Sequence, residues 1–430
     1  MPNFPEPTVG DTSWFVHDRF GLFIHWGLYA LAARHEWVKN HERITDAAYQ
    51  KYFDHFYPDL FDPQAWARAA HQAGMRYMVI TSKHHEGFCL WDSQYTDYKV
   101  TNTPWGKDLL KPIVKAFRKE GLRVGFYYSL LDWHHPQFPI DGHHPLRDDP
   151  NAAEINQGRD VTQYAKYVRK QVKELLSLFD TLDILWLDFS YPGYTYKDLP
   201  GKGRLDWQSE KLYKMIRELA PTIILNNRMD YTDVPPDIHT PEQYQPTEWL
   251  RVNGKPVVWE TCQTFSGSWG YHRDEATWKS PEQLIRMLVN TVSCGGNLLM
   301  NVGPTGRGVF DHRAINSLEV YADWMRLHSR SIYGCTQSDF TPPTDVRYTQ
   351  NGDRLFAHIF AWPFNFLELP GLAGKIAYAQ MLNDASEIRF KEMGAATSSL
   401  ELAPTPGSIV LTLPIQKPDV VVPVVELYLK

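Results

Sequence analysis

The sequence predicts an irregular (β/α)8-like barrel of the TIM type, followed by a C-terminal antiparallel β-sandwich. Three observations predict this fold. Strand-like apolar runs alternate with amphipathic helices. These runs end in polar or aromatic residues. The helical pattern stops near Phe340, where short β-rich runs take over. We place the boundary at about residue 338, which gives a barrel domain over residues 1–337 and a sandwich domain over residues 338–430.

The stretch 182–190 is the clearest candidate strand. Its apolar run ILWL leads directly into one carboxylate, Asp188, and follows a long amphipathic helix. Such a continuous run is typical of a parallel strand that is buried on both faces. Burying a carboxylate costs free energy, and polar residues at the C-terminal ends of barrel strands are typically catalytic. An Asp that caps the following loop is the alternative, and this stretch alone does not decide between them.

Six further runs share this pattern, which makes seven candidate barrel strands. They cover residues 19–27, 76–85, 123–133, 222–228, 256–262 and 295–304, and their polar residues include His, Asp, Arg, Glu and Asn. Converging ends of this kind indicate a polar pocket with aromatic walls. An eighth strand either lies in a poor pattern or is missing from an irregular barrel.

The segments between these runs predict the helices and the sandwich. Helical patterns cover residues 63–74, 109–121, 161–179, 209–219, 281–292 and 312–327. Short β-rich runs separated by turn residues cover 354–360, 376–381, 408–413 and 420–429. Two long insertions, 132–160 and 229–254, are expected to be loops on the active face.

Composition narrows the class of protein. The formal net charge of -6 leaves no basic surface for nucleic acid. No apolar run approaches the roughly eighteen residues of a membrane span, and the N-terminus does not resemble a signal peptide. The four cysteines are scattered. We therefore expect a cytoplasmic protein, and its size favours a homo-oligomer. The 15 Trp and 23 Tyr favour binding to sugar rings, although aromatic cores are the alternative.

The spacing of ionisable residues favours chemistry without a metal. The 17 histidines include three adjacent pairs, but neighbours on a strand point to opposite faces. No common zinc or iron spacing occurs, so we predict no metal and no cofactor. The loop histidines are expected at the surface, whereas His25, His84 and His85 suit neutral hydrogen bonding to hydroxyls, or else are satisfied core residues. No GxSxG elbow occurs. A carboxylate pair in an aromatic cleft is the minimal equipment for glycoside hydrolysis.

Seven phrases of this sequence resemble the α-L-fucosidases of glycoside hydrolase family 29. They are FGLFIHWG, HEWV, TSKHHEGFCLW, GFYYSLLDW, WLDFS, WETCQTFSGSWGY and GGNLLMNVGPTGRG, and the resemblance runs from about residue 14 to 331. The C-terminal region fits the family's β-sandwich in outline. The resemblance implies a retaining exo-fucosidase on an irregular barrel, which acts on a fucosylated oligosaccharide or glycoconjugate and needs no metal.

The resemblance also implies roles for individual residues. Asp188, at the end of WLD, corresponds to the nucleophile. The fucose-binding positions correspond to His25, Glu36, Trp37, His84, His85, Tyr127, Arg228 and Trp269. The motif before Arg228 reads NNR where the family has NDR, so Asn227 departs from the pattern.

The acid/base has two principal candidates. Glu242 in TPEQ resembles the acid/base motif of some members, and Glu260 in VWETC resembles the residue proposed in others. We favour Glu242, because a loop Glu can approach the scissile oxygen from the substrate side, and place Glu36 third. Glu260 follows apolar residues inside a predicted strand, where a supporting role is the alternative. Two other functions stay open: a retaining glycosidase for a different sugar, and a catalytically inactive fucose-binding protein on the same barrel.

Overall fold

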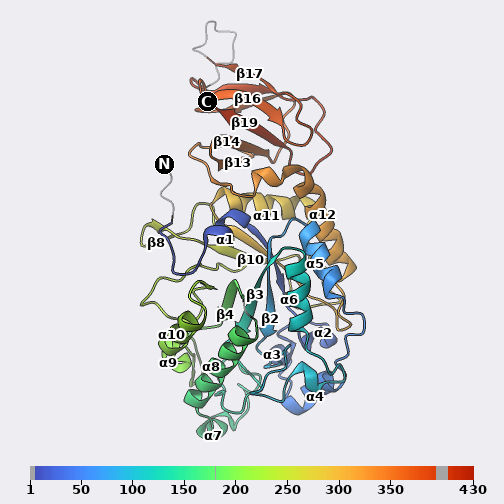
Figure 1. Ribbon diagram of the computed structural model, residues 1–430, viewed down its shortest axis with the longest axis vertical. Coiled ribbons are helices and arrows are strands. Elements are labelled where there is room, and N and C mark those ends of the chain that lie inside the picture. Colours follow the sequence, from blue (N-terminus) through green and yellow to red (C-terminus); the bar gives the residue numbers. More distant parts are fainter. Residues whose placement is uncertain (1–4, 180, 394–404) are drawn as a thin grey trace.

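A curled parallel sheet of seven strands forms most of a barrel (Figure 1). The computed structural model describes residues 5–179, 181–393 and 405–430. The strand order is β10-β11-β1-β2-β3-β4-β7. The strands are β1 (Phe20–Ile24), β2 (Tyr77–Lys83), β3 (Arg123–Ser129), β4 (Ile184–Asp188), β7 (Ile224–Leu225), β10 (Glu260–Thr264) and β11 (Asn297–Val302). Each of the seven predicted runs supplies one strand, which confirms the barrel-like α/β fold class.

A short segment, residues 238–242, occupies the eighth position of the barrel. We call it the closing segment. Isolated parallel bridges join it to both edges of the sheet, and they pair Asn226 with Ile238, His239 with Trp259, and Glu242 with Cys262. The backbone N–H groups of Glu260 and Cys262 donate to the carbonyls of His239 and Pro241. The sequence prediction treated residues 229–254 as a loop insertion, and the structure shows that part of it closes the barrel.

Helices surround the sheet. The longer ones are α5 (Pro63–Gln72), α6 (Leu110–Lys119), α8 (Val161–Leu178), α10 (Ser209–Leu219), α11 (Pro281–Ser293) and α12 (His312–His328), each within two residues of its predicted bounds. Shorter ones are α1 (Ser13–Asp18), α2 (Tyr29–Ala32), α3 (Val38–His41), α4 (Asp46–Asp54), α7 (Ala152–Gln157) and α9 (Arg204–Trp207), with 3-10 turns at Val100–Asn102 and Ser329–Ser331. Side-chain caps fix the starts of α4, α5, α8, α11 and α12, from Thr45, Asp62, Asp160, Ser280 and Asp311.

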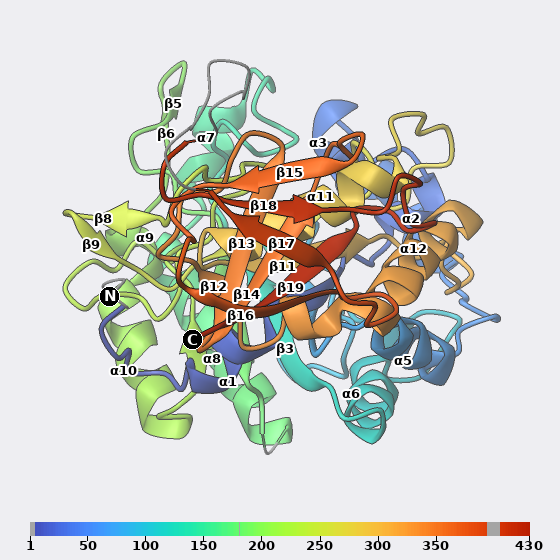
Figure 2. The same cartoon turned by 90° about the horizontal axis from the view of Figure 1, so that it is seen from above.

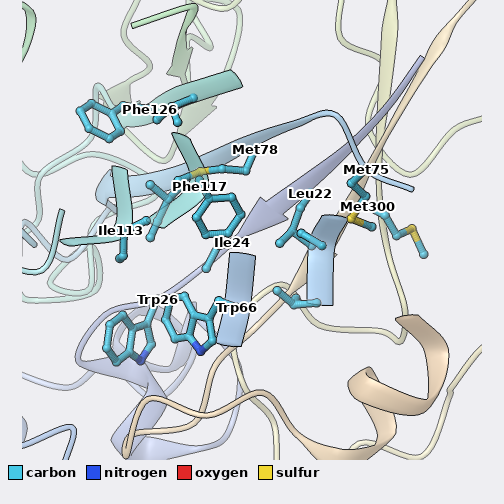
Figure 3. Close-up of a cluster of buried hydrophobic side chains, with 14 of the residues drawn as sticks. Leu22, Ile24, Trp26, Trp66, Met75, Met78, Ile113, Phe117, Phe126 and Met300 are labelled. Carbon is cyan, nitrogen blue, oxygen red and sulfur yellow. The ribbon is translucent and has the colours of Figure 1, made fainter. Parts of the chain in front are cut away.

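Alternating side chains of the strands form two apolar regions. On the outer face, Leu22 and Ile24 of β1 belong to the same buried cluster as Phe117 of α6 (Figure 3). On the inner face, Phe23 of the same strand belongs to a second cluster with Trp186 of β4. Strand side chains alternate between faces, so one strand supplies both regions. The barrel interior is therefore filled with side chains, as in other closed parallel barrels.

Two antiparallel sheets form the C-terminal part. One has the order β12-β13-β14-β19-β16, and the other has the order β15-β18-β17. Their strands are β12 (Thr336–Gln337), β13 (Val346–Asn351), β14 (Arg354–Ile359), β15 (Phe366–Leu369), β16 (Ile376–Met381), β17 (Arg389–Glu392), β18 (Ile409–Thr412) and β19 (Val424–Leu429). Figure 2 shows the sheets stacked over one another. Buried apolar side chains from both sheets form one cluster between them. The domain boundary at residue 338 stays a prediction.

The sandwich lies at the end of the barrel where the strands begin. Arg19, directly before β1, donates from Nε to the carbonyl of Cys335, directly before β12, at 2.8 Å. Helix α11 also packs beside β13. Asp188 is the last residue of β4. The mouth that carries Asp188 therefore faces away from the sandwich.

One predicted strand begins too early in the chain. Residues 256–262 were expected as a strand, but β10 begins at Glu260, which places Glu260 at the start of the strand instead of near its end. A hairpin of β8 (Arg251–Val252) and β9 (Lys255–Pro256) occupies the preceding residues. Its turn residues Asn253 and Gly254 both have positive φ, of 50° and 78°. Asn-Gly is a strong hairpin signal, so this hairpin was predictable from the sequence.

The remaining general predictions concern location, assembly and metals. Among the described residues, no helix combines the length and apolar character needed to cross a bilayer. Within the same part of the chain, no group of three or more His, Cys, Asp or Glu side chains is placed to hold a metal ion. A cytoplasmic location and a homo-oligomeric state stay predictions. A further short hairpin, β5 (Thr195–Tyr196) with β6 (Leu199–Pro200), lies between β4 and α9 in the chain.

Candidate active site

Two adjoining cavities open at the C-terminal end of the barrel strands. We call the first the inner cavity. It has a volume of about 370 Å³ and is lined by Phe23, His25, Trp37, His84, His85, Tyr127, Trp186, Asp188, Phe189, Glu242, Cys262 and Trp269. We call the second the outer cavity. It has a volume of about 510 Å³ and is lined by His143, Asp188, Phe189, Ser190, Tyr191, Asn227, Arg228 and Asp230. Asp188 and Phe189 belong to both, so the carboxylate stands where the two meet.

Asp188 accepts hydrogen bonds on both of its oxygens. The Tyr127 hydroxyl donates to Oδ2 at 2.7 Å, and Arg228 Nη1 donates to Oδ1 at 3.0 Å. Burial raises the pKa of Asp188 and the Glu242 carboxylate raises it further, whereas Arg228 and the Tyr127 hydroxyl lower it. The two donors hold the carboxylate in one orientation and favour its charged form.

Arg228 joins the two carboxylates of the site. Its Nη1 also donates to Glu242 Oε2, at 2.6 Å. The two acceptor oxygens of Asp188 and Glu242 therefore cannot be more than 5.6 Å apart, the sum of the two contacts to Nη1. Thr240 of the closing segment fixes the guanidinium by accepting from Nε and Nη2, both at 2.9 Å. The side chain of Glu242 is 42% exposed, whereas that of Asp188 is 10% exposed. One carboxylate is thus buried and the other is open to the solvent side.

Three histidines of the inner cavity are neutral. Burial lowers the pKa of His25 to about 3, and it lowers the pKa values of His84 and His85 well below their ordinary value. His25 Nδ1 lies 2.6 Å from Asn301 Oδ1, and His85 Nδ1 lies 2.7 Å from Ser129 Oγ. A neutral ring that donates from Nδ1 keeps Nε2 as an acceptor. His25 and His85 can therefore accept hydrogen bonds from hydroxyl groups in the cavity.

Both residues of the His84-His85 pair line the inner cavity, with ring centroids 3.9 Å apart. The expectation that adjacent histidines point to opposite faces is wrong here, because β2 ends at Lys83 and the pair lies beyond the strand. The expectation of surface positions for the loop histidines is also wrong for two of them. His143 lines the outer cavity, and His144 is buried.

Glu36 does not line the inner cavity but lies behind its wall. Its Oε2 accepts from the backbone N–H groups of Trp269 and Gly270, at 3.1 Å and 2.8 Å. Burial raises the pKa of Glu36 to about 7. The structure brings the other predicted site residues to the inner cavity or, for Arg228, to the boundary of the outer one. Glu36 instead holds the loop that presents Trp269.

Several residues of the site were not predicted. Phe189, directly after Asp188, has a φ of 83°, a left-handed conformation that is strained for an aromatic residue. This turn places its ring in the walls of both cavities. Phe23, Trp186 and Cys262 also line the inner cavity. The inward positions of Phe23 and Trp186 follow from strand alternation, which the sequence could have revealed.

Comparison with known proteins identifies the family. The family model described as "Alpha-L-fucosidase" matches residues 9–330. The chain belongs to the α-L-fucosidase family. It is 27% identical over 438 residues to a plasma α-L-fucosidase of Rattus norvegicus, covering 94% of this chain and 87% of that protein. As an α-L-fucosidase, it is a glycoside hydrolase.

Solved structures of fucosidases share the fold. The α-L-fucosidase isoenzyme 1 from Paenibacillus thiaminolyticus is 43% identical with a TM-score of 0.90, covering 97% of this chain and 98% of that one. A family 29 α-L-fucosidase from Bacteroides thetaiotaomicron is 27% identical with a TM-score of 0.84, covering 99% of this chain and 98% of that chain. The latter structure is a trapped covalent intermediate, obtained with 2-fluoro-fucosyl fluoride and a Glu-to-Gln mutant.

Tyr127→Phe is expected to move the acidic limb of the kcat/KM profile of this fucosidase to higher pH. The Tyr127 hydroxyl lowers the pKa of Asp188, so its removal lets that pKa rise. At acidic pH a larger fraction of the enzyme then carries a protonated Asp188. The loss of a hydrogen bond to a charged group should also reduce kcat/KM by about 10- to 100-fold. Tyr128→Phe is the matched control, since Tyr128 donates at 2.8 Å to Gln171 on the outer side of the sheet. Identical acidic limbs in wild type and Tyr127→Phe would contradict the role of Tyr127.

Proposed function

We propose that this fucosidase hydrolyses terminal α-L-fucosides with retention of configuration. Asp188 attacks the anomeric carbon and forms a fucosyl-enzyme, and Glu242 first protonates the leaving oxygen and then activates water. The observation that carries this proposal is the shared contact with Arg228, which keeps the two acceptor oxygens within 5.6 Å, the sum of its two contacts. Retaining glycosidases have carboxyl groups about 5–5.5 Å apart, whereas inverting ones need about 6.5–9.5 Å.

The different environments of the two carboxylates support their division of roles. Asp188 is buried and held by two donors, as a nucleophile that must approach one carbon atom requires. Glu242 is half-exposed on the closing segment, where a proton can exchange with solvent between the two steps. Glu260 is fully buried at the start of β10 and does not line either cavity. This favours Glu242 over Glu260 as the acid/base.

The inner cavity suits the fucose ring. Trp37 and Trp269 provide apolar surface for the C–H groups of a sugar, and His25 and His85 offer acceptors for its hydroxyls. Its volume of about 370 Å³ is within the range of small-ligand sites. The covalent intermediate of the Bacteroides relative, trapped with a Glu-to-Gln mutant, supports a retaining mechanism with a glutamate for this chain too.

The outer cavity suits the leaving group. It begins at Asp188 and extends between residues 189–191 and the insertion that carries His143. Tyr191 and His143 pack edge-to-face with centroids 4.6 Å apart, which gives one side of the cavity an aromatic wall. Asp230 adds a carboxylate that can accept from sugar hydroxyls. We propose that a saccharide carrying the fucose occupies this cavity.

The stereochemistry of the first product tests the proposal. With 4-nitrophenyl α-L-fucoside, we expect proton NMR to show α-L-fucose first, followed by slow conversion to the β anomer. Initial release of β-L-fucose would contradict retention. Protection against heat by fucose without any turnover would support the inactive fucose-binding alternative.

A further inference from the structure

Glu260 is a buried carboxyl that the two-carboxylate mechanism leaves without a role. It has no exposed surface and lies inside the barrel at the start of β10. Its Oε1 accepts from the indole Nε1 of Trp186 at 3.2 Å, and its Oε2 accepts from the Tyr77 hydroxyl at 2.5 Å. Among the described residues Glu260 forms no direct ion pair, and the Arg228 guanidinium, which also lowers its pKa, acts on it from a greater distance. Burying a carboxyl costs free energy, so the residues that it contacts should indicate what it contributes.

Trp186 connects Glu260 to the surroundings of Asp188. The Tyr127 ring stacks on the indole with centroids 5.7 Å apart and an interplanar angle of 22°. The Arg228 guanidinium lies over the same indole, 4.5 Å from the ring centroid. Tyr127 and Arg228 are the two side chains that donate to the oxygens of Asp188. Both donors of the nucleophile therefore rest on one aromatic surface.

We propose that Glu260 is a positioning residue for the nucleophile. Glu260 fixes the Trp186 indole, and Tyr127 and Arg228 rest on that indole. The inference rests on the proposed role of Asp188. An indole N–H in a dry interior requires an acceptor, and Glu260 supplies it from the opposite side of the barrel. The second oxygen accepts from the hydroxyl of Tyr77 on β2, which offsets part of the cost of burying the carboxyl. Three strands thus meet at one carboxyl, directly below the reacting residues.

This role does not require a charge on Glu260. Burial raises its pKa to about 7, against the hydrogen bonds from Tyr77 and Trp186, which lower it. Either protonation state keeps an oxygen that can accept from the indole N–H. The amide of Gln can do the same, by accepting from Trp186 with its oxygen and donating to the Tyr77 oxygen with its nitrogen. A proton-transferring residue, in contrast, loses its function on change to Gln.

The test measures how fast Asp188 reacts in variants of the full-length protein. The probe is 2-fluoro-fucosyl fluoride, whose fluoride leaves with little help from an acid, so the rate of inactivation reports the attack by the nucleophile. We expect Glu260→Leu to slow inactivation by about 10- to 100-fold, since small misplacements of reacting groups have effects of this size. Glu260→Gln should restore the rate to within about threefold of wild type.

Tyr77→Phe is the matched control, because it removes the other hydrogen bond of Glu260 and leaves the one to Trp186. We expect it to lower the melting temperature and to keep the inactivation rate within about threefold of wild type. If Glu260→Leu does not fold, Trp186→Phe takes its place. It keeps an aromatic ring but removes the N–H, and it should slow inactivation by about 10-fold or more.

Three outcomes would decide against the positioning role. Inactivation of Glu260→Leu at the wild-type rate would show that Glu260 acts on stability alone. Equal losses in Glu260→Gln and Glu260→Leu would show that its charge or proton is needed. A wild-type rate in Trp186→Phe would show that the indole N–H is not the connection. Failure of the proposed function is a separate result, in which peptide mapping of the inactivated wild type finds no label on Asp188.

Discussion

Asp188→Asn is expected to reduce kcat by at least about a thousandfold, equivalent to roughly 4 kcal/mol of activation free energy. The change keeps the size of the side chain and hydrogen-bonding groups for Tyr127 and Arg228 but removes the negative charge that attacks the anomeric carbon. The measurement is steady-state kinetics with an aryl fucoside, together with thermal unfolding to show that the fold is retained. Added azide should restore turnover and give a fucosyl azide of inverted configuration.

Asp183→Asn is the matched control for this variant. Asp183 stands directly before β4, at the end opposite Asp188, and pairs with Arg118 and Arg123, although its own side chain is only 11% exposed. It should lower the melting temperature while kcat stays within about threefold, because these ion pairs lie at the other end of the strand and Asp183 lines neither cavity. An Asp188→Asn variant with half the wild-type activity would exclude Asp188 as the nucleophile.

Glu242→Ala is expected to abolish most of the cleavage of natural fucosides, with a loss of about 10²- to 10⁴-fold. A sugar alcohol leaves poorly unless it is protonated, whereas an activated aryl group needs little protonation. The variant should therefore still form the fucosyl-enzyme from activated aryl fucosides. Hydrolysis of this fucosyl-enzyme should then become the rate-limiting step. A burst of aryl alcohol in stopped-flow measurements checks this. Azide should then accelerate turnover and give a product of retained configuration.

Glu260→Ala provides the contrast within the same protein. On the proposed assignment it slows the attack by Asp188 for good and poor leaving groups alike, since Glu260 contacts Trp186 and Tyr77 below the cavity. Azide should not rescue it. Azide rescue with retention in Glu260→Ala, and none in Glu242→Ala, would reverse the two assignments while leaving Asp188 as the nucleophile.

The fold of the barrel was largely predictable because its strands are buried on both faces. The runs around Leu22, Val79 and Trp186 are continuously apolar, as parallel strands covered by helices must be. Helix bounds followed from Pro63 and Pro281 at the starts of α5 and α11. The convergence of polar residues followed as well, because the C-terminal ends of parallel barrel strands share one face.

Other features depend on contacts that the local sequence does not contain. The closing segment reads IHTPE, without an apolar run or alternation, because it is held by bridges to its two neighbours. The orientation of His84 and His85 depends on the end of β2 at Lys83. Four strands of the C-terminal part, β12, β13, β15 and β17, were also missed. β15 and β17 are four residues long and carry exposed side chains, so their apolar signal is weak.

Asp188 and Glu242 lie on parts of the fold that tolerate changes of the surrounding sequence to different degrees. Asp188 ends a strand that has a partner on each side, and an inserted residue in β4 would turn its apolar side chains to the wrong face. Of the five residues of the closing segment, only Ile238 belongs to an apolar core cluster. Apart from Thr240, which holds the Arg228 guanidinium beside Asp188, and Glu242, its side chains can therefore vary with little effect on the apolar interior. An engineer who wants the fucosyl group passed to a sugar instead of water should keep these two residues and vary the sequence around them, because such changes reshape the acceptor side and leave the contacts of the nucleophile in place.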